Sequence, residues 1–256
     1  KELLYDLEKG KSWQLRHNDA PGLLGLMDAN CIDVAVVSSI HGIFYRNCQR
    51  ANEELAAEIE SHRDRFVPFA TLNPNYPGWQ RNLRICHDDL GMRGLRLFPA
   101  YHDYALTDGP CLELINAATE LVMPVALPMR VVDARQRHWM DTERNLTLPE
   151  LDAVVQACPK TTFIILNGLG LESASFMGES KANGRQIVAD LSRMTAVLQN
   201  NLGVLISNYG AGSVVFGTGM PFKYPRPAFL KMDILEASEK DKQRIRSGNM
   251  AGILGL

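Results

Sequence analysis

The sequence predicts a single eight-stranded β/α barrel spanning residues 1–256, and three observations support this. Short runs rich in Val, Ile, Leu and Phe alternate with longer segments of helical periodicity, as repeated βαβ units require. The runs are apolar almost throughout, which suits strands covered on both faces. The length allows such a barrel to form as one domain, and no low-complexity linker divides it. A doubly wound open sheet is the alternative, because strand count does not show closure.

The elements expected along the chain can be given in order. The strands are residues 3–8, 32–38, 66–72, 94–98, 125–129, 162–166, 186–191 and 213–217. The helices are one that begins at Asp19, an N-cap residue followed by Pro21, and then residues 52–62, 77–90, 110–122, 148–158, 195–209, 226–237 and 238–253. Ser238 and Asp241 have the spacing of a capping box at the start of the last helix. The Gly- and Ser-rich stretch 168–184 predicts a loop with a short helix at most.

Composition and charge narrow the classes of partner. The net charge of −2 and the isoelectric point near 6.3 give no general attraction to nucleic acid, and no apolar run is long enough to span a bilayer. We expect a small-molecule partner, no nucleic acid and no membrane, and leave a homo-oligomer open. The five cysteines lack the spacing of a zinc knuckle or redox pair, and no secretory signal pattern occurs, so a cytoplasmic location is expected.

The working side chains of a β/α barrel lie at the carboxyl ends of its strands. The residues found there are Ser38, Ser39 and His41; Asn73; Tyr101 and His102; Arg130, Asp133 and His138; Asn167; Asp190 and Arg193; and Gly219, Phe222 and Lys223. The catalytic candidates are His102, His138 and Asp190. The substrate-binding candidates are Arg130, Tyr101, Asn167, Arg193 and Phe222.

Each type of side chain has a chemical reason for this choice and a structural alternative. Histidines such as His102 and His138 titrate near neutral pH and suit proton transfer, although His138 lies in a loop and could be a surface residue. The planar fork of Arg130 suits a carboxylate, unless Asp133 or Glu143 pairs with it.

The same choice applies to the other polar candidates. Asn167 can donate to an oxyanion, or it can satisfy loop backbone groups. Asp190 and Arg193 can face the substrate, or they can form a local pair at the start of a helix. Tyr101 lies in a segment, Tyr-His-Asp-Tyr, that mixes aromatic and polar residues as ligand-lined loops do.

Five segments in this order resemble a known family. They are IDVAVVSS, RFVPFATLNPNYPGW, GMRGLRLFPAYHDY, VVFGTGMPFKYP and IRSGNMAGILGL. Together they resemble the amidohydrolase-related family that includes aminocarboxymuconate-semialdehyde decarboxylase, over nearly the whole chain. The resemblance implies the barrel fold and a hydrolase or decarboxylase activity.

The resemblance also implies a metal site, from which this sequence departs. In the family, a His-x-His on the first strand, histidines on the fifth and sixth strands and an Asp on the eighth hold a divalent ion. Here the corresponding places have Glu8, Pro128, Asn167 and Gly219, and Arg96 stands where some relatives carry a bridging lysine. We therefore expect no metal ligands and no cofactor; a divalent metal such as zinc is the alternative, which these positions do not support.

Two functions remain. The first is an amidohydrolase-like hydrolase or decarboxylase for a small, carboxylated substrate, with a degenerate and metal-free site. The second is a non-catalytic small-molecule-binding or accessory barrel protein. Elemental analysis and a test of turnover discriminate between them.

Overall fold

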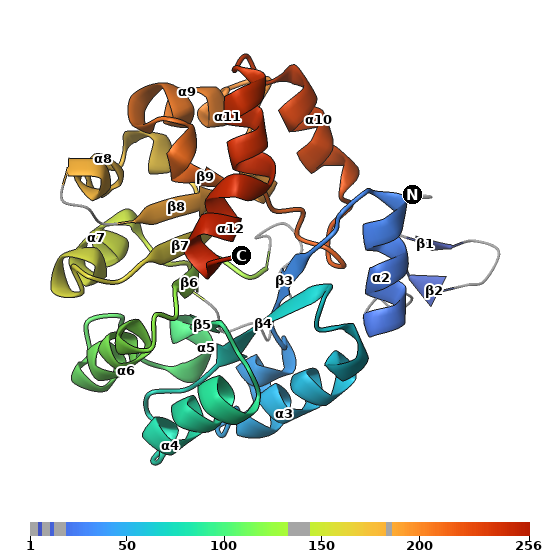
Figure 1. Ribbon diagram of the computed structural model, residues 1–256. Helices are drawn as coiled ribbons and strands as arrows, with labels where there is room; N and C mark the ends of the chain where they lie inside the picture. Colours follow the sequence, from blue (N-terminus) through green and yellow to red (C-terminus); the bar gives the residue numbers. More distant parts are fainter. Residues whose placement is uncertain (1–4, 7–10, 13–18, 133–143, 183–185) are drawn as a thin grey trace.

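The computed structural model describes residues 5–6, 11–12, 19–132, 144–182 and 186–256. Seven parallel strands form one curled sheet in which each strand pairs with the next along the chain (Figure 1). They are β3 (Ala35–Val37), β4 (Phe66–Thr71), β5 (Gly94–Arg96), β6 (Val125–Pro128), β7 (Phe163–Leu166), β8 (Ile187–Asp190) and β9 (Val214–Val215). These strands lie within seven of the eight predicted runs, so the parallel α/β architecture is confirmed.

The prediction for the first strand is wrong in its placement. Within the predicted run 3–8, β1 (Tyr5–Asp6) pairs antiparallel with β2 (Lys11–Ser12) in a separate two-stranded sheet. An eighth barrel strand would be covered on both faces, and the run carries the carboxylates Asp6 and Glu8, which are costly to bury without partners. In the part of the chain that the structure describes, the curled sheet therefore has seven strands, with β3 and β9 at its edges.

Helices alternate with the strands and surround the sheet (Figure 1). They are α2 (Ala20–Ala29), α3 (Gln49–Glu58), α4 (Trp79–Arg84), α5 (Pro99–His102), α6 (Gly109–Glu120), α7 (Leu148–Ala157), α8 (Ser175–Ala182), α9 (Asn201–Tyr209), α10 (Arg226–Ile234), α11 (Glu239–Gln243) and α12 (Asn249–Leu254). The predicted caps are present: Asp19 Oδ1 accepts from Gly22 N at 2.8 Å, and Ser238 Oγ accepts from Asp241 N at 3.1 Å. No described helix is long and apolar enough to cross a membrane.

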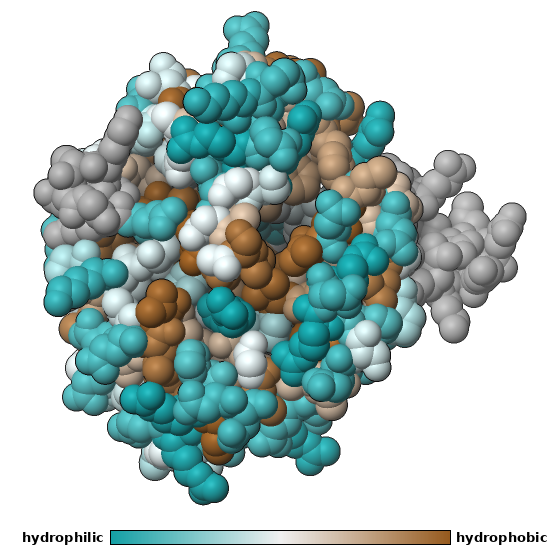
Figure 2. All heavy atoms as spheres, in the orientation of Figure 1, coloured by the Kyte–Doolittle hydropathy of each residue, from teal (hydrophilic) through white to brown (hydrophobic). Residues whose placement is uncertain are grey.

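Helix α12 closes one end of the curled sheet. Leu254 packs into a buried cluster with the inward-facing strand residues Val67, Phe69, Ala126, Ile164, Val188 and Val215. Arg93, just before β5, donates from Nη2 to Leu254 O at 3.0 Å, so α12 lies at the amino ends of the strands. Figure 2 views this closed end and shows apolar residues around a hollow near its centre. The carboxyl ends of the strands, where a site is expected, lie at the opposite end.

Candidate active site

Asn167 joins three strand ends at the open end of the sheet. It follows β7 directly and has a left-handed backbone conformation, with φ of 54°. Its Nδ2 donates to Arg130 O, beyond β6, at 3.0 Å. Its Oδ1 accepts from Arg193 Nε, beyond β8, at 3.2 Å and from Lys223 Nζ, in the loop beyond β9, at 2.9 Å. One amide therefore holds a guanidinium and an amine side by side.

Asp190 supplies a carboxylate to this region. It ends β8 and is 9% exposed, and its Oδ1 accepts from Ser192 N at 2.7 Å. Its charge favours the protonated forms of Lys223 and Lys231. Asp190 caps the turn, and Arg193 Nε contacts Asn167.

Lys231 fixes the turn that carries Ser192 and Arg193. Its Nζ, on α10, donates to Leu191 O at 3.0 Å and to Ser192 O at 2.8 Å. Burial lowers the pKa of Lys231, and Asp190 opposes this shift. Because both carbonyls are main-chain acceptors, Lys231 positions the turn.

The pKa of the Lys223 amine is strongly lowered. Burial lowers the pKa of Lys223 to about 7, and the positive charges of Arg193, Lys231 and Arg130 act in the same direction against Asp190. At neutral pH the free amine and the ammonium form are therefore both populated. We refer to Arg130, Arg193, Lys223 and Lys231 as the cationic cluster.

Arg96 connects β5 to the end of β3. Its Nη1 donates to Ser38 Oγ at 2.8 Å, and its guanidinium carbon lies 4.9 Å from the centre of the Phe98 ring. Burial lowers the pKa of Arg96 to about 10, and Asp190 raises it. The Nε atom of Arg96 is buried without a hydrogen-bond partner among the described residues. Arg96 thus adds a further cation within the field of Asp190.

The other predicted candidates occupy different surroundings. His102, on α5, is buried, and its Nε2 donates to Gly42 O at 2.9 Å, while burial lowers its pKa. Tyr101 lines a small hollow beside Pro128, and Phe222 is 55% exposed. His138 lies outside the described residues. Of the predicted set, the structure therefore brings Arg130, Asn167, Asp190 and Arg193 together.

Sequence reasoning missed Ser192 and Lys231, and did not select Lys223 from among the strand-end residues. Lys231 lies inside a helix, so nothing in its position marks it. Lys223 has a local signal, because its backbone N donates to Gly219 O at 3.0 Å in a turn in which Gly219 has φ of 72°. A glycine four residues before a lysine, just after an apolar strand, is the pattern that places this amine.

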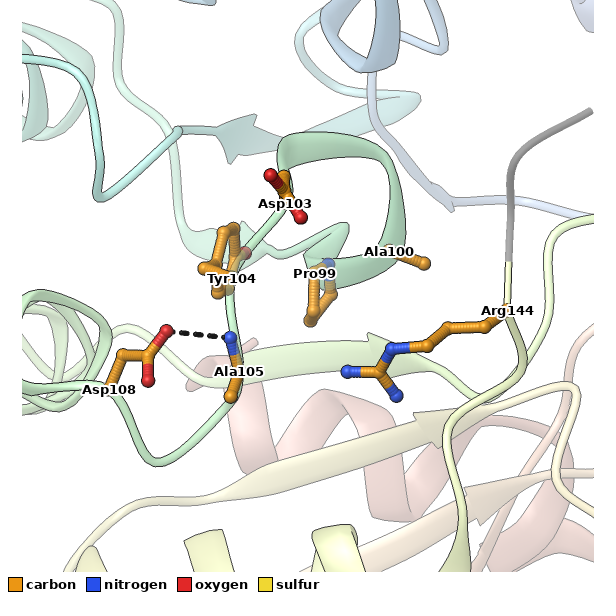
Figure 3. A pocket seen from close by; sticks show the side chains of 7 residues that line it. All are labelled: Pro99, Ala100, Asp103, Tyr104, Ala105, Asp108 and Arg144. Carbon is orange, nitrogen blue, oxygen red and sulfur yellow. Dashed lines mark hydrogen bonds between the residues drawn. The ribbon is translucent and has the colours of Figure 1, made fainter.

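A cavity of about 400 Å³ lies beside α5 (Figure 3), and no residue of the cationic cluster is among those that line it. It is lined by Pro99, Ala100, Asp103, Tyr104, Ala105, Asp108 and Arg144. Asp108 Oδ2 accepts from Ala105 N at 2.8 Å, and Arg144 is paired with Glu150 at 2.5 Å. Asp108 and Arg144 thus have local structural partners, and we centre the candidate site on the cationic cluster at the carboxyl ends of the strands.

Solved structures with this fold include several decarboxylases. The 2,6-dihydroxybenzoate decarboxylase from Rhizobium superposes with a TM-score of 0.72 at 17% identity, covering 91% of this chain and 87% of that one. The dihydroxybenzoic acid decarboxylase from Polaromonas sp. JS666, with bound manganese and 2-nitroresorcinol, superposes with a TM-score of 0.71 at 17% identity, covering 91% of this chain and 85% of that one. The 5-carboxyvanillate decarboxylase from Novosphingobium aromaticivorans, with manganese and 4-hydroxy-3-methoxy-5-nitrobenzoic acid, has a TM-score of 0.71 at 16% identity. This match covers 91% of this chain and 79% of that one. At these identities the likeness shows the fold.

The manganese in the Polaromonas and Novosphingobium structures corrects the expectation of no cofactor, because proteins of this fold point to a divalent metal. The described residues of this chain do not fit such an ion. They contain no group of three or more His, Cys, Asp and Glu side chains that could hold it. Pro128 and Gly219 offer no ligand side chain, and Asn167 Oδ1 already faces Arg193 and Lys223. A further cation would be repelled there.

Sequence comparison gives a match to one family model. The model, described as amidohydrolase, covers residues 15–256, which include all seven strands of the curled sheet and the whole cationic cluster. No curated protein matches the chain. Because the match extends over most of the sequence, the chain belongs to the amidohydrolase family.

Proposed function

We propose that this chain is a hydrolase or decarboxylase that acts on a small, carboxylated substrate at the cationic cluster. The observation that carries the proposal is the shared contact of Arg193 and Lys223 with Asn167 Oδ1. Both side chains donate to one neutral amide oxygen at the open end of the sheet, and a guanidinium and an amine in this arrangement can bind a carboxylate through charge-assisted hydrogen bonds. The decarboxylases with this fold act on small aromatic acids, which supports a substrate of the same size.

The proposed roles follow from the contacts. Arg193, assisted by Arg130, binds the carboxylate, and Asn167 fixes the direction of Arg193 and Lys223. Lys223, with both protonation forms populated near neutral pH, exchanges a proton with the reacting group. In decarboxylation the proton replaces the departing carboxyl group, and in hydrolysis it goes to the leaving group. Asp190 holds the turn that carries Ser192 and limits the net charge.

The remaining predicted residues lie near the strand ends in the sequence, and we propose roles for them on that basis. Tyr101 and Phe222 would contact the apolar part of the substrate. His102 and His138 stay proposals for proton transfer, and the hydrogen bond from His102 to Gly42 O gives His102 a structural task as well. We also propose that the site is degenerate, since Pro128 and Gly219 replace ligand positions of the family.

A non-catalytic binding barrel is the second candidate function. It is favoured by the same departure from the family's ligand positions at Pro128, Asn167 and Gly219. Both functions require the cationic cluster to bind an anion. They differ in whether the bound molecule is converted.

The test is a calorimetric titration with 2,6-dihydroxybenzoate and with resorcinol, which lacks the carboxylate. We expect the acid to bind at least about tenfold more tightly, and Arg193→Ala to remove this preference, because one charge-assisted contact contributes about 1.5–3 kcal/mol. Arg226→Ala, at an exposed position on α10, is the matched control. Equal affinity for acid and phenol would contradict the proposal. Release of CO₂ or an ester hydrolysis product, with and without added manganese, separates the enzyme from the binding protein.

A further inference from the structure

Lys223 is held at both ends of its side chain and still reaches the surface. Its backbone N donates to Gly219 O, and its Nζ donates to Asn167 Oδ1. Between these points the stem crosses Gly219, where an added Cβ would lie 2.8 Å from Lys223 Cδ. The residue is half-buried, so part of its side chain is exposed to solvent. The fold therefore directs one amine into the site in a fixed orientation.

The surroundings of Lys223 accept a neutral amine. A neutral amine has two N–H groups and one lone pair, whereas the ammonium form has three N–H groups and no lone pair. Asn167 Oδ1 accepts one N–H, and the Ser192 hydroxyl, 3.4 Å from Nζ, can act as acceptor or donor. Lys231 is the opposite case, because its two acceptors are backbone carbonyls that cannot donate to a lone pair.

The charges around the amine of Lys223 also favour its neutral form. Arg193 on the turn after β8, Lys231 on α10 and Arg130 after β6 face it, with Asp190 as the opposing charge, and the pKa of Lys223 is lowered to about 7. A lysine that is desolvated or placed beside other cations is one that acts as a nucleophile towards carbonyl carbon.

We propose that Lys223 is an imine-forming catalytic lysine for 3-oxo acids, with Arg193 holding the carboxylate of the substrate. The contact of both side chains with Asn167 Oδ1 places an amine beside a guanidinium, as a carbonyl and a nearby carboxylate in one small molecule require. The inference rests on the proposed function for carboxylate binding. It selects the decarboxylase over the hydrolase and names the substrate class.

The chemical steps balance without an oxidant or reductant. The neutral amine of Lys223 adds to the ketone carbon, and loss of water with uptake of one proton from solvent forms the protonated imine. The bond between the carboxyl carbon and C2 then breaks, CO₂ leaves, and the electron pair moves to the imine nitrogen to give an enamine. A proton adds to C2, and water hydrolyses the resulting imine to release the ketone and free Lys223.

The test is reductive trapping of the protein with acetoacetate, the simplest ketonic 3-oxo acid. Sodium borohydride reduces an imine to a stable secondary amine, which intact mass and peptide mass spectrometry detect and locate. We expect one adduct, on Lys223, and no adduct in Lys223→Arg, which keeps the positive charge but lacks the nucleophile. The control variant Lys240→Arg, changed at an exposed position on α11, should form the adduct on Lys223 to the same extent as the parent protein.

The outcomes separate this inference from the proposed function. Trapping on Lys223 that weakens at least about tenfold in Arg193→Ala supports both. Binding of 2,6-dihydroxybenzoate without trapping, or equal trapping at Lys223 and at exposed lysines such as Lys160, overturns the imine and leaves the carboxylate site intact. If neither dihydroxybenzoate binding nor trapping is found, the proposed function is contradicted, and the imine inference that rests on it is contradicted as well.

Discussion

The Oδ2 atom of Asp190 occupies the space in which a side chain at Gly217 would begin. A Cβ atom added to Gly217, just beyond β9, would lie 1.6 Å from this oxygen. The end of β9 can therefore approach the end of β8 only because residue 217 has no side chain. This contact fixes the carboxylate that, among the described residues, opposes the cationic charges at Lys223.

Gly217→Ala should displace the Asp190 carboxylate and destabilise the protein. A clash with a buried group typically costs about 1–3 kcal/mol, so the melting temperature should fall by several degrees. Gly252→Ala on α12 is the matched control, since no atom lies within 4 Å of an added Cβ there and alanine favours the helix. Thermal denaturation followed by circular dichroism measures both variants. A Gly217→Ala protein as stable as Gly252→Ala would show that β8 and β9 can separate without cost.

Asn167→Asp should raise the pKa of Lys223. The substitution places a carboxylate against Lys223 Nζ and Arg193 Nε in nearly the same shape, and an opposite charge at this distance stabilises the ammonium form by about one to three pKa units. The pH dependence of acetylation at Lys223, read by peptide mass spectrometry, should therefore shift to higher pH. Lys240, which is exposed on α11, is the internal reference. An unshifted midpoint would mean that Lys223 does not contact residue 167 in solution.

The parts of the molecule that follow from local chemistry were predictable. Seven strands could be located because buried parallel strands need continuous apolar runs, whereas the run 3–8 contains Asp6 and Glu8 and its described part pairs elsewhere. The strand ends also placed Asn167 and Asp190 correctly at the open end. What sequence could not supply is the direction of each side chain. His102 lies four residues beyond the predicted strand 94–98 and is a candidate by its position, but the turn of α5 buries it against Gly42.

Gly219→Ala should reduce the reactivity of Lys223. Residue 219 has φ of 72°, which costs a non-glycine residue about 1–2 kcal/mol, and the added Cβ would meet Lys223 Cδ at 2.8 Å. We expect the lysine stem to move away from Asn167 and borohydride trapping to fall by more than about fivefold. Gly255→Ala, also at positive φ but in open space beyond α12, controls for backbone strain alone. Equal loss of trapping in both variants would assign the effect to general destabilisation.

The lowered pKa of Lys223 should also appear in the pH dependence of stability. In the folded protein this group titrates near 7, while in the unfolded chain it titrates near the ordinary value of 10.5. Between these values the unfolded chain binds more protons, so the contribution of Lys223 to the free energy of unfolding rises with pH from about 7 to about 10.5.

Below that window both states are protonated, and the cost of burying the ammonium group is present in full. Lys223→Met removes the titration, so its stability relative to the parent protein should be most favourable near pH 7 and should decline towards pH 10. Urea unfolding at several pH values measures this difference, and Lys240→Met on the surface of α11 should show no such trend. If the difference between Lys223→Met and the parent protein stays constant across the window, the amine of Lys223 titrates as an exposed lysine does.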